Sequence, residues 1–403
     1  MFPRSCDPDA GRGGSVLLRS LSGWQFIWML YFHSVKRILF VGLICLCHPI
    51  QAESSDPKSS VPADLKPVAV DSLIVDVLSD DVSDTYVSKT TFSESELSNV
   101  VKAGAKVVSG ETLLVANLGY GLRLRTKVGS TEHVLLFDTG TEGQAFLHNC
   151  KAMGVDLGGV EAIAITHGHW DHMGALPQAI PAIVAKRGRG NLTIHVNQDM
   201  FVERGLELSN KEIIPVEEVI TQSSMEALGA KVVNDPKARG LLDQHFYYSG
   251  EIPRVSSFEK GRQDHLCRSG HKSDWHPDPL LMDERMVVVN VKGLGLVVFS
   301  ACSHAGIVNV CTEVKRLFPD IPIYAVMGGL HLGGVMEKLI PQSVEGLKPF
   351  NISHIITGHC TGWRALHALA NAYGDRVSQS AIGTTYTFEK KPSKETTGTT
   401  KAK

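Results

Sequence analysis

The segment Thr166-His167-Gly168-His169-Trp170-Asp171-His172 constrains the fold of this chain more than any other part of its sequence. Four ligand-type side chains fall within six residues, and an apolar run at 162–165, predicted to be a strand, leads directly into them. So many imidazole and carboxylate groups in one turn need a common partner, and divalent metals are bound by this set of groups. The pattern therefore predicts a strand that ends in a metal-binding loop.

The spacing within this loop indicates two metal positions. His167 and His169 can point to one side and converge on one cation, while Asp171 and His172 point toward a second one close by. Two metals about 3.5–4 Å apart can hold a bridging hydroxide and polarise a substrate oxygen. Asp171 is also expected to be catalytic, because it could orient that hydroxide or take a proton from it.

The motif resembles that of the metallo-β-lactamase superfamily, and the similarity covers most of residues 110–388. Three further segments match in the expected order: residues 135–140, 297–304 and 357–362. The resemblance implies an α/β fold, a metallo-β-lactamase-like αββα sandwich in which helices flank two mixed β-sheets. The catalytic domain would span residues 67–390.

The resemblance also implies the metal ligands by position. They form two groups, one for each metal: His167, His169 and His304, then Asp171, His172 and His359. One or two divalent ions are implied, with Zn²⁺ expected and Mn²⁺ or Fe²⁺ as alternatives. Asp138 would support the metal loop by accepting a hydrogen bond from a histidine, which fixes the tautomer of that histidine.

One feature departs from the family pattern. Many members supply a bridging aspartate from a strand end between the third and the last histidine. Here the corresponding strand, at 323–327, is followed by Gly328-Gly329-Leu330-His331, which contains no carboxylate. We assign His331 to the site as a residue that could bind metal, bind substrate or donate a proton, and the number of metals stays open.

A finer similarity points to the dihydropterin-ribofuranosylaminobenzene-phosphate synthase-like proteins, through residues 249–254, 302–309, 328–332 and 358–362. Superfamily membership implies a hydrolase in which metal-bound hydroxide attacks an ester, phosphodiester or amide. The alternative is a synthase-like transferase that uses the metal as a Lewis acid. A metal-binding protein without turnover is a weaker third hypothesis, and a class B β-lactamase assignment is not warranted, because the surroundings of a site decide its substrate.

Residues 199–285 form the main insertion, between the first metal loop and the third histidine. We expect it to make a lid over the cleft and to bind substrate through Glu251 and Arg254. Arg254 could pair with a phosphate or carboxylate, although a plain surface position would explain it equally well. Three other histidines of the insertion fit an exposed loop and are left out of the site: His265, His271 and His276.

Composition limits the partners. The net charge of −2 over 403 residues gives no basic footprint for nucleic acid. We therefore expect a small-molecule substrate, phosphorylated or pterin-like, and no nucleic-acid partner. Five of the eight cysteines would remain after cleavage of the N-terminal segment, and this odd, unevenly spaced set predicts no disulfide framework. Cys360 is expected to be a small packing residue, with a role as ligand or nucleophile as the alternative.

The N-terminus has the pattern of a secretory signal. Lys36-Arg37 precedes an apolar run at 38–47, and small Ala52 follows. Residues 1–52 are therefore predicted to be a signal, with Met29 as a candidate true start, which implies a secreted or periplasmic protein. An uncleaved membrane anchor is the alternative. Residues 53–66 are predicted to be a flexible linker and 391–403 a disordered tail.

Local patterns predict several further elements. Strand character is expected at 67–78, 110–116 and 191–196. Helices are expected at 143–153, in part of 173–187, at 307–318 and at 363–373.

Overall fold

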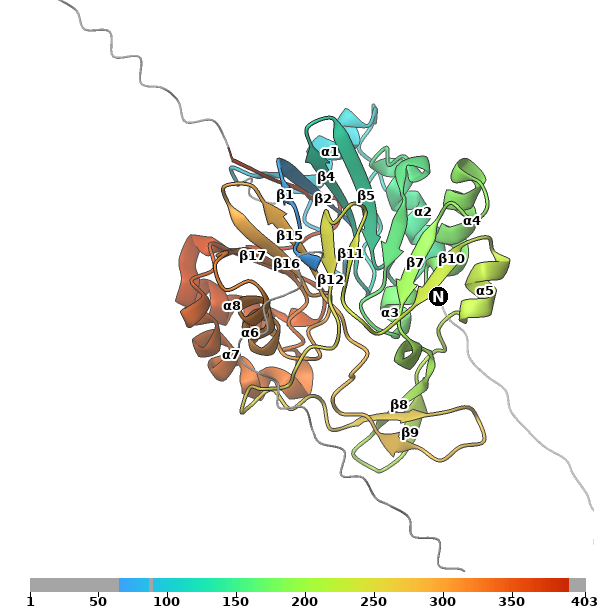
Figure 1. Cartoon of the computed structure of the whole chain (residues 1–403), viewed down its shortest axis with the longest axis vertical. Helices are drawn as coiled ribbons and strands as arrows, with labels where there is room; N and C mark the ends of the chain where they lie inside the picture. Colours follow the sequence, from blue (N-terminus) through green and yellow to red (C-terminus); the bar gives the residue numbers. More distant parts are fainter. Residues whose placement is uncertain (1–64, 87–89, 391–403) are drawn as a thin grey trace, which may run out of the picture. The chain divides into compact units, whose positions relative to one another are not determined.

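The computed structural model describes residues 65–86 and 90–390, which form two large β-sheets packed face to face (Figure 1). The first sheet has the order β11-β12-β15-β16-β17-β18-β19, with β1 paired to β15. Its strands are β1 (Ala69–Val70), β11 (Arg239–Leu241), β12 (Phe246–Tyr248), β15 (Val287–Val291), β16 (Gly295–Phe299), β17 (Ile323–Gly328), β18 (His354–Thr357) and β19 (Val377–Gln379).

The second sheet has the order β10-β7-β6-β5-β4-β2-β20-β3. Its strands are β2 (Ser72–Ser79), β3 (Ser93–Glu94), β4 (Gly121–Val128), β5 (Thr131–Phe137), β6 (Ala162–Ala164), β7 (Thr193–Val196), β10 (Lys231–Asn234) and β20 (Thr385–Glu389). Both sheets are mixed: β16-β17-β18-β19 and β5-β6-β7-β10 run parallel, whereas β15-β16 and β2-β4-β5 are antiparallel.

Strand alternation decides which side chains fill the space between the sheets. In β15, Val287, Val289 and Val291 join the core cluster shared by both sheets, while Val288 joins the cluster on the outer face. The second sheet follows the same rule, since Leu135 of β5 faces inward and Leu136 faces outward. Both faces of each sheet are therefore apolar. The inner faces pack against each other, and the outer faces must be buried by other elements.

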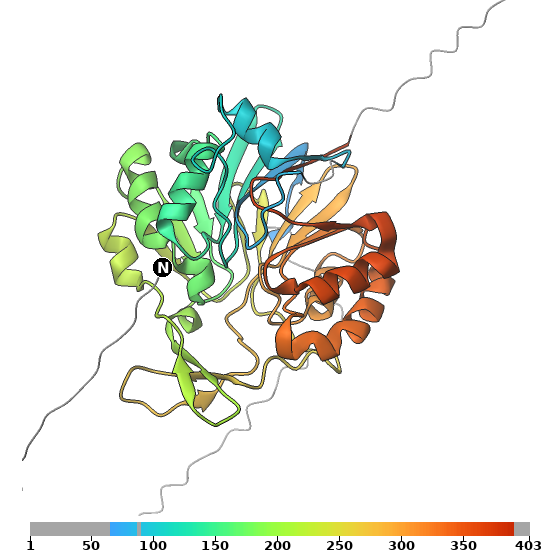
Figure 2. The same cartoon turned by 180° about the vertical axis from the view of Figure 1, so that it is seen from behind.

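Helices bury the outer face of each sheet (Figures 1 and 2). The outer face of the second sheet packs against α2 (Gly143–Ala152) and α4 (Leu176–Arg187), and that of the first sheet against α6 (Ile307–Leu317), α7 (Ile340–Leu347) and α8 (Trp363–Tyr373). In α6, Ile307, Val310, Cys311 and Val314 recur at helical spacing and are all buried. The short helices are α1 (Glu96–Lys102), α3 (Trp170–Met173) and α5 (Gln222–Ala227). The predicted αββα sandwich is confirmed.

The stretch 199–285 is divided between the sandwich and a separate small sheet. Strands β10, β11 and β12 belong to the two large sheets. The third sheet has the order β14-β13-β8-β9, with β8 (Glu203–Glu207), β9 (Ile213–Pro215), β13 (His265–Arg268) and β14 (His276–Pro277). Figure 1 shows β8 and β9 projecting beyond the ends of the large sheets. A lid can therefore come only from part of this stretch.

The prediction of a strand at 110–116 is wrong. The segment begins with a turn, in which Leu113 N donates to Ser109 O, and then runs without regular structure. Its backbone donors bind side chains instead of a neighbouring strand: Leu114 N donates to Glu96 Oε1 and Val115 N to Asn149 Oδ1. The strands predicted at 67–78 and 191–196 and the helices predicted at 143–153, 307–318 and 363–373 are present.

The predicted signal, most of the predicted linker and the predicted tail lie outside the described residues. Among the residues that the structure describes, no helix is both long and apolar enough to cross a membrane.

Gly328 lies where the ends of the parallel strands β16 and β17 approach each other closely. It has a φ of +135°, and a Cβ added there would lie 2.0 Å from the carbonyl oxygen of Ser300. We expect Gly328→Ala to lower the free energy of unfolding by at least about 2 kcal/mol, since both backbone strain and a backbone clash are introduced. The control is Gly110→Ala, where a Cβ meets nothing within 4 Å. Equal denaturant midpoints for the two variants would contradict this account.

Candidate metal centre

The first metal loop lies at the carboxyl end of β6. The strand ends at Ala164, His167 and His169 follow in an extended turn, and α3 then carries Asp171 and His172. Gly168 lets this loop pass against the neighbouring chain, because a Cβ there would lie 2.0 Å from the carbonyl oxygen of Met200. Glycine is therefore required between the two histidines.

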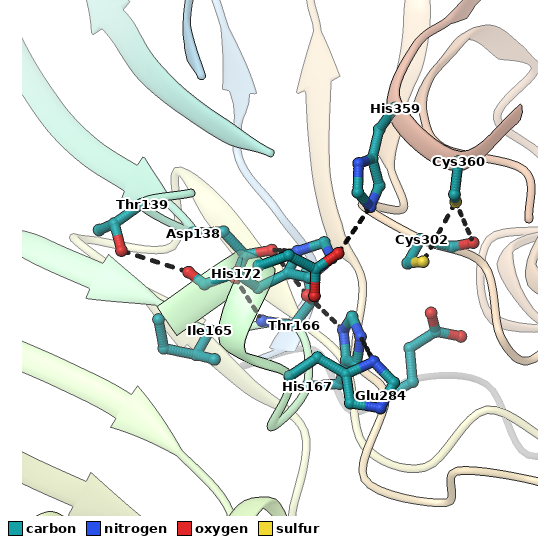
Figure 3. A network of polar contacts seen from close by, with 12 residues as sticks. Asp138, Thr139, Ile165, Thr166, His167, His172, Glu284, Cys302, His359 and Cys360 are labelled. Carbon is teal, nitrogen blue, oxygen red and sulfur yellow. Dashed lines mark hydrogen bonds and ion pairs between the residues drawn. The ribbon is translucent and has the colours of Figure 1, made fainter. Parts of the chain in front are cut away.

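The other predicted ligands come from the first sheet. His304 follows β16 and His359 follows β18, and both strands are parallel to β17 between them. The carboxyl ends of parallel strands meet at one edge of a sheet, so these loops reach a common place. There they face the loop delivered by β6 of the second sheet (Figure 3).

The structure brings together both predicted groups of three ligands: the first trio (His167, His169 and His304) and the second trio (Asp171, His172 and His359). Within each trio, the ligand atoms lie within 4.8 Å of one another. Within the first trio, His167 Nε2 and His169 Nδ1 are 3.0 Å apart. Within the second, His359 Nε2 lies 3.3 Å from Asp171 Oδ2.

Several imidazole nitrogens of these trios are buried without a hydrogen-bond partner. Among the described residues, His172 Nε2 and His304 Nε2 are two such atoms. Buried polar atoms nearly always have a partner, so these nitrogens suit a ligand that accepts a lone pair. A divalent cation is such a ligand, and the donor set fits it.

Asp138 takes the predicted supporting position. Its Oδ2 accepts a hydrogen bond from His172 Nδ1 at 2.7 Å and from Thr166 Oγ1, and its Oδ1 accepts the Thr166 N–H. With Nδ1 carrying the proton, Nε2 of His172 presents its lone pair to the second trio.

Three further buried carboxylates hold the ligand loops, and no sequence pattern indicated them. Asp283 accepts the Gly168 N–H, and Glu284 accepts the N–H groups of His304 and Ala305. Asp80 accepts the His359 N–H at 2.9 Å. Asp283 and Glu284 are adjacent in the chain and Asp80 precedes Asp81, but no motif around these residues indicates such a role.

Electrostatics keeps the first trio neutral. Burial, followed by repulsion from neighbouring cationic groups, holds the pKa of His167, His169 and His304 well below its ordinary value. Burial would raise the pKa of Asp171, but the adjacent His172 and His359 outweigh it and hold this pKa below its usual range. Neutral imidazoles and an ionised carboxylate are the forms that bind metal.

A pocket of about 260 Å³ opens onto both trios. Its lining includes members of each trio, His331, Cys302 and Cys360, and, from the small third sheet and the chain beside it, Gly205, Leu206, Val216 and Leu266. His331 has a φ of +47°, and its Nδ1 lies 3.2 Å from Cys302 Sγ.

The expectation that His265 lies on an exposed loop is wrong. Pairing of β13 with β8 places its ring 5.6 Å from that of His169, and the side chain is buried in the pocket wall. Burial and nearby Arg262 lower its pKa to about 3. The other two histidines of the run, His271 and His276, are exposed as expected.

Glu251 and Arg254 are not brought to this pocket. The guanidinium of Arg254 donates to the carbonyl oxygens of Ile252, Leu280 and Leu281, so it braces the loop. Glu251 is exposed. The two guanidiniums that do line the pocket are already paired, Arg204 with Asp283 and Arg262 with Asp264.

Residues 127–201 match the family model of the metallo-beta-lactamase superfamily. The chain is 27% identical over 242 residues to 7,8-dihydropterin-6-methyl-4-(beta-D-ribofuranosyl)-aminobenzene-5'-phosphate synthase of Methanocaldococcus jannaschii, covering 57% of this chain and 76% of that protein. It is 26% identical over 236 residues to the uncharacterized protein MJ0448 of the same organism, covering 59% and 82%. The crystal structure of Tm1679, a metal-dependent hydrolase of the beta-lactamase superfamily, matches with a TM-score of 0.56 at 20% identity, over 79% of this chain and 100% of that one.

If the first trio binds metal, variants of its histidines should bind less metal than the wild type. His167→Ala and His169→Ala should each lower bound metal by at least one equivalent, because each removes one of three ligands of one position. Elemental analysis of the purified variants after dialysis measures this. His271→Ala, at an exposed histidine, is the matched control and should keep the wild-type content. Wild-type metal content in both His167→Ala and His169→Ala would refute the site.

Proposed function

We propose that the chain is a metal-dependent hydrolase of small molecules within the metallo-β-lactamase superfamily, whose family model matches residues 127–201. The observation that carries this proposal is the meeting of two ligand trios at one pocket. A divalent metal held by these residues, with zinc expected, would supply a Lewis acid and a water of lowered pKa. Both would assist hydrolysis of an ester, phosphodiester or amide.

Asp171 is proposed to hold and deprotonate the attacking water. Its carboxylate belongs to the second trio and also lines the pocket, so it reaches both the ligand cluster and the substrate space. His359 contacts one carboxylate oxygen at 3.3 Å and fixes its direction. The low pKa makes this carboxylate a weak base, so it would take the proton only from a water that the bound metal had acidified.

His331 is proposed to donate a proton to the leaving group. Its ring lines the pocket, and its centroid lies 4.2 Å from that of His304. It is half-buried, so substrate in the pocket can reach it. A positioned imidazole in such a place typically contributes about 10²–10⁴-fold to the rate.

The pocket wall supports a substrate with an apolar or aromatic body. Leu118, Trp170, Leu206, Val216 and Leu266 supply apolar surface. Both guanidiniums of the lining are neutralised by carboxylates, so a phosphate on the substrate would depend on the metal for its charge partner. The proposed reaction therefore acts on the bond nearest the metal and binds the rest of the molecule by apolar contact.

A synthase-like transferase is the second candidate. It is favoured by the similarity to the archaeal protein named as a dihydropterin-ribofuranosylaminobenzene-phosphate synthase. In that case the same trios would hold the Lewis acid, and the pocket would hold a pterin-like substrate. The predicted secretory signal favours hydrolysis, since synthesis of a cofactor normally takes place in the cytoplasm.

His331→Ala provides the test of the hydrolase. We expect kcat toward a panel of chromogenic esters, phosphodiesters and anilides to fall by about 100-fold or more, with metal content unchanged. Reactions in ¹⁸O-labelled water should place the label in the product. His367→Ala, on α8 outside the pocket, is the control. Loss of metal in His331→Ala would make it a ligand instead, and absence of label in any product would favour the transferase.

A further inference from the structure

One side chain of the pocket lies close to both ligand trios and has no role in the scheme above. Cys302 follows β16, two residues before His304, and is 2% exposed. Its Sγ lies within 4.8 Å of ligand atoms of His167 and His172, and it forms a second such group with His304 and His331. A third group joins it to His359 and Cys360. The sulfur is therefore central to the whole cluster.

These separations suit shared coordination. A Zn–S bond is about 2.3 Å and a Zn–N bond about 2.0–2.1 Å, so sulfur and nitrogen on one tetrahedral metal lie roughly 3.5 Å apart. Groups confined within 4.8 Å reach this spacing with small side-chain movements. Because the groups of Cys302 include members of both trios, its sulfur can contact both metal positions.

The charge balance of the cluster calls for another anion. The six proposed ligands comprise five histidines and the single carboxylate of Asp171. Two dications would bring four positive charges into a buried site against one negative ligand, which is costly. The nearby carboxylates of Asp283 and Glu284 already accept backbone N–H groups.

The backbone beside the sulfur leaves no room for a carboxylate from the end of β17. A Cβ added at Gly329 would lie 2.7 Å from Cys360 Sγ and 2.6 Å from the carbonyl oxygen of Ala301. Cys360 Sγ is itself 3.1 Å from Cys302 Sγ, and Figure 3 shows the two cysteines beside His359. Sulfur thus occupies the space next to the trios that a side chain at 329 would need.

We propose that Cys302 is a further metal ligand, whose thiolate lies within reach of both ligand trios. On binding, the thiol proton leaves to solvent and a sulfur lone pair forms the bond to the metal, because a coordinating thiol is deprotonated. Cys360 packs against Cys302 and positions it. The added thiolate favours Zn²⁺, Co²⁺ or Fe²⁺ over Mn²⁺ and Mg²⁺. This inference rests on the proposed function only in requiring that metal binds at the trios.

Cobalt titration of the full chain under anaerobic conditions tests the proposal, since sulfur bound to Co²⁺ absorbs in the near ultraviolet. We expect this charge-transfer absorption in the wild type, its loss in Cys302→Ser, and its retention in Cys360→Ser and in the control Cys267→Ser. Cys267 lies in β13 and does not line the pocket. Absorption that persists in Cys302→Ser, or disappears in Cys360→Ser alone, would overturn the assignment.

A measurement on the wild type alone covers the case in which Cys302→Ser does not fold. X-ray absorption at the zinc edge should find sulfur at about 2.3 Å from the metal. Only nitrogen and oxygen neighbours would overturn the inference while leaving the proposed hydrolase intact. A chain that binds neither cobalt nor zinc would overturn both.

Discussion

Buried carboxylates that accept backbone N–H groups hold every loop that carries a proposed metal ligand. Asp138 accepts the N–H of Thr166, Asp283 that of Gly168, Glu284 that of His304 and Asp80 that of His359. A carboxylate that accepts such bonds in a dry site makes strong, directional contacts. The imidazoles are therefore aimed by the backbone beneath them before any metal arrives, and the rest of the centre depends on this arrangement.

The same carboxylates join the two halves of the sandwich. Asp80 follows β2 of the second sheet and holds the loop after β18 of the first. Asp283, just before β15 of the first sheet, holds the loop after β6 of the second. Because the ligands come from both sheets, their separation depends on how the sheets pack, and these contacts fix it at the point where the chemistry would take place.

The sequence predicted the parts of the site that are local. His167, His169, Asp171 and His172 are adjacent in the chain, so their shared role could be inferred from spacing. His304 and His359 required the family resemblance.

The residues that hold the ligand loops could not be predicted, because they are distant in the chain from the groups that they bind. Asp80 is separated from His359 by 279 residues, and Asp283 lies 115 residues from Gly168. His265 was wrongly expected to be exposed, because only the pairing of β13 with β8 brings it beside His169. The prediction of a strand at 110–116 was wrong because the side chains of Glu96 and Asn149 accept hydrogen bonds from the backbone N–H groups of this segment.

The central claim is that the two trios hold divalent metal at one pocket. Anomalous diffraction from crystals of the zinc-loaded protein, recorded on both sides of the zinc edge, tests it most directly. The account predicts zinc peaks among His167, His169 and His304 and among Asp171, His172 and His359. Zinc peaks only at other places on the chain, or no zinc peak in crystals grown with the metal, would contradict it.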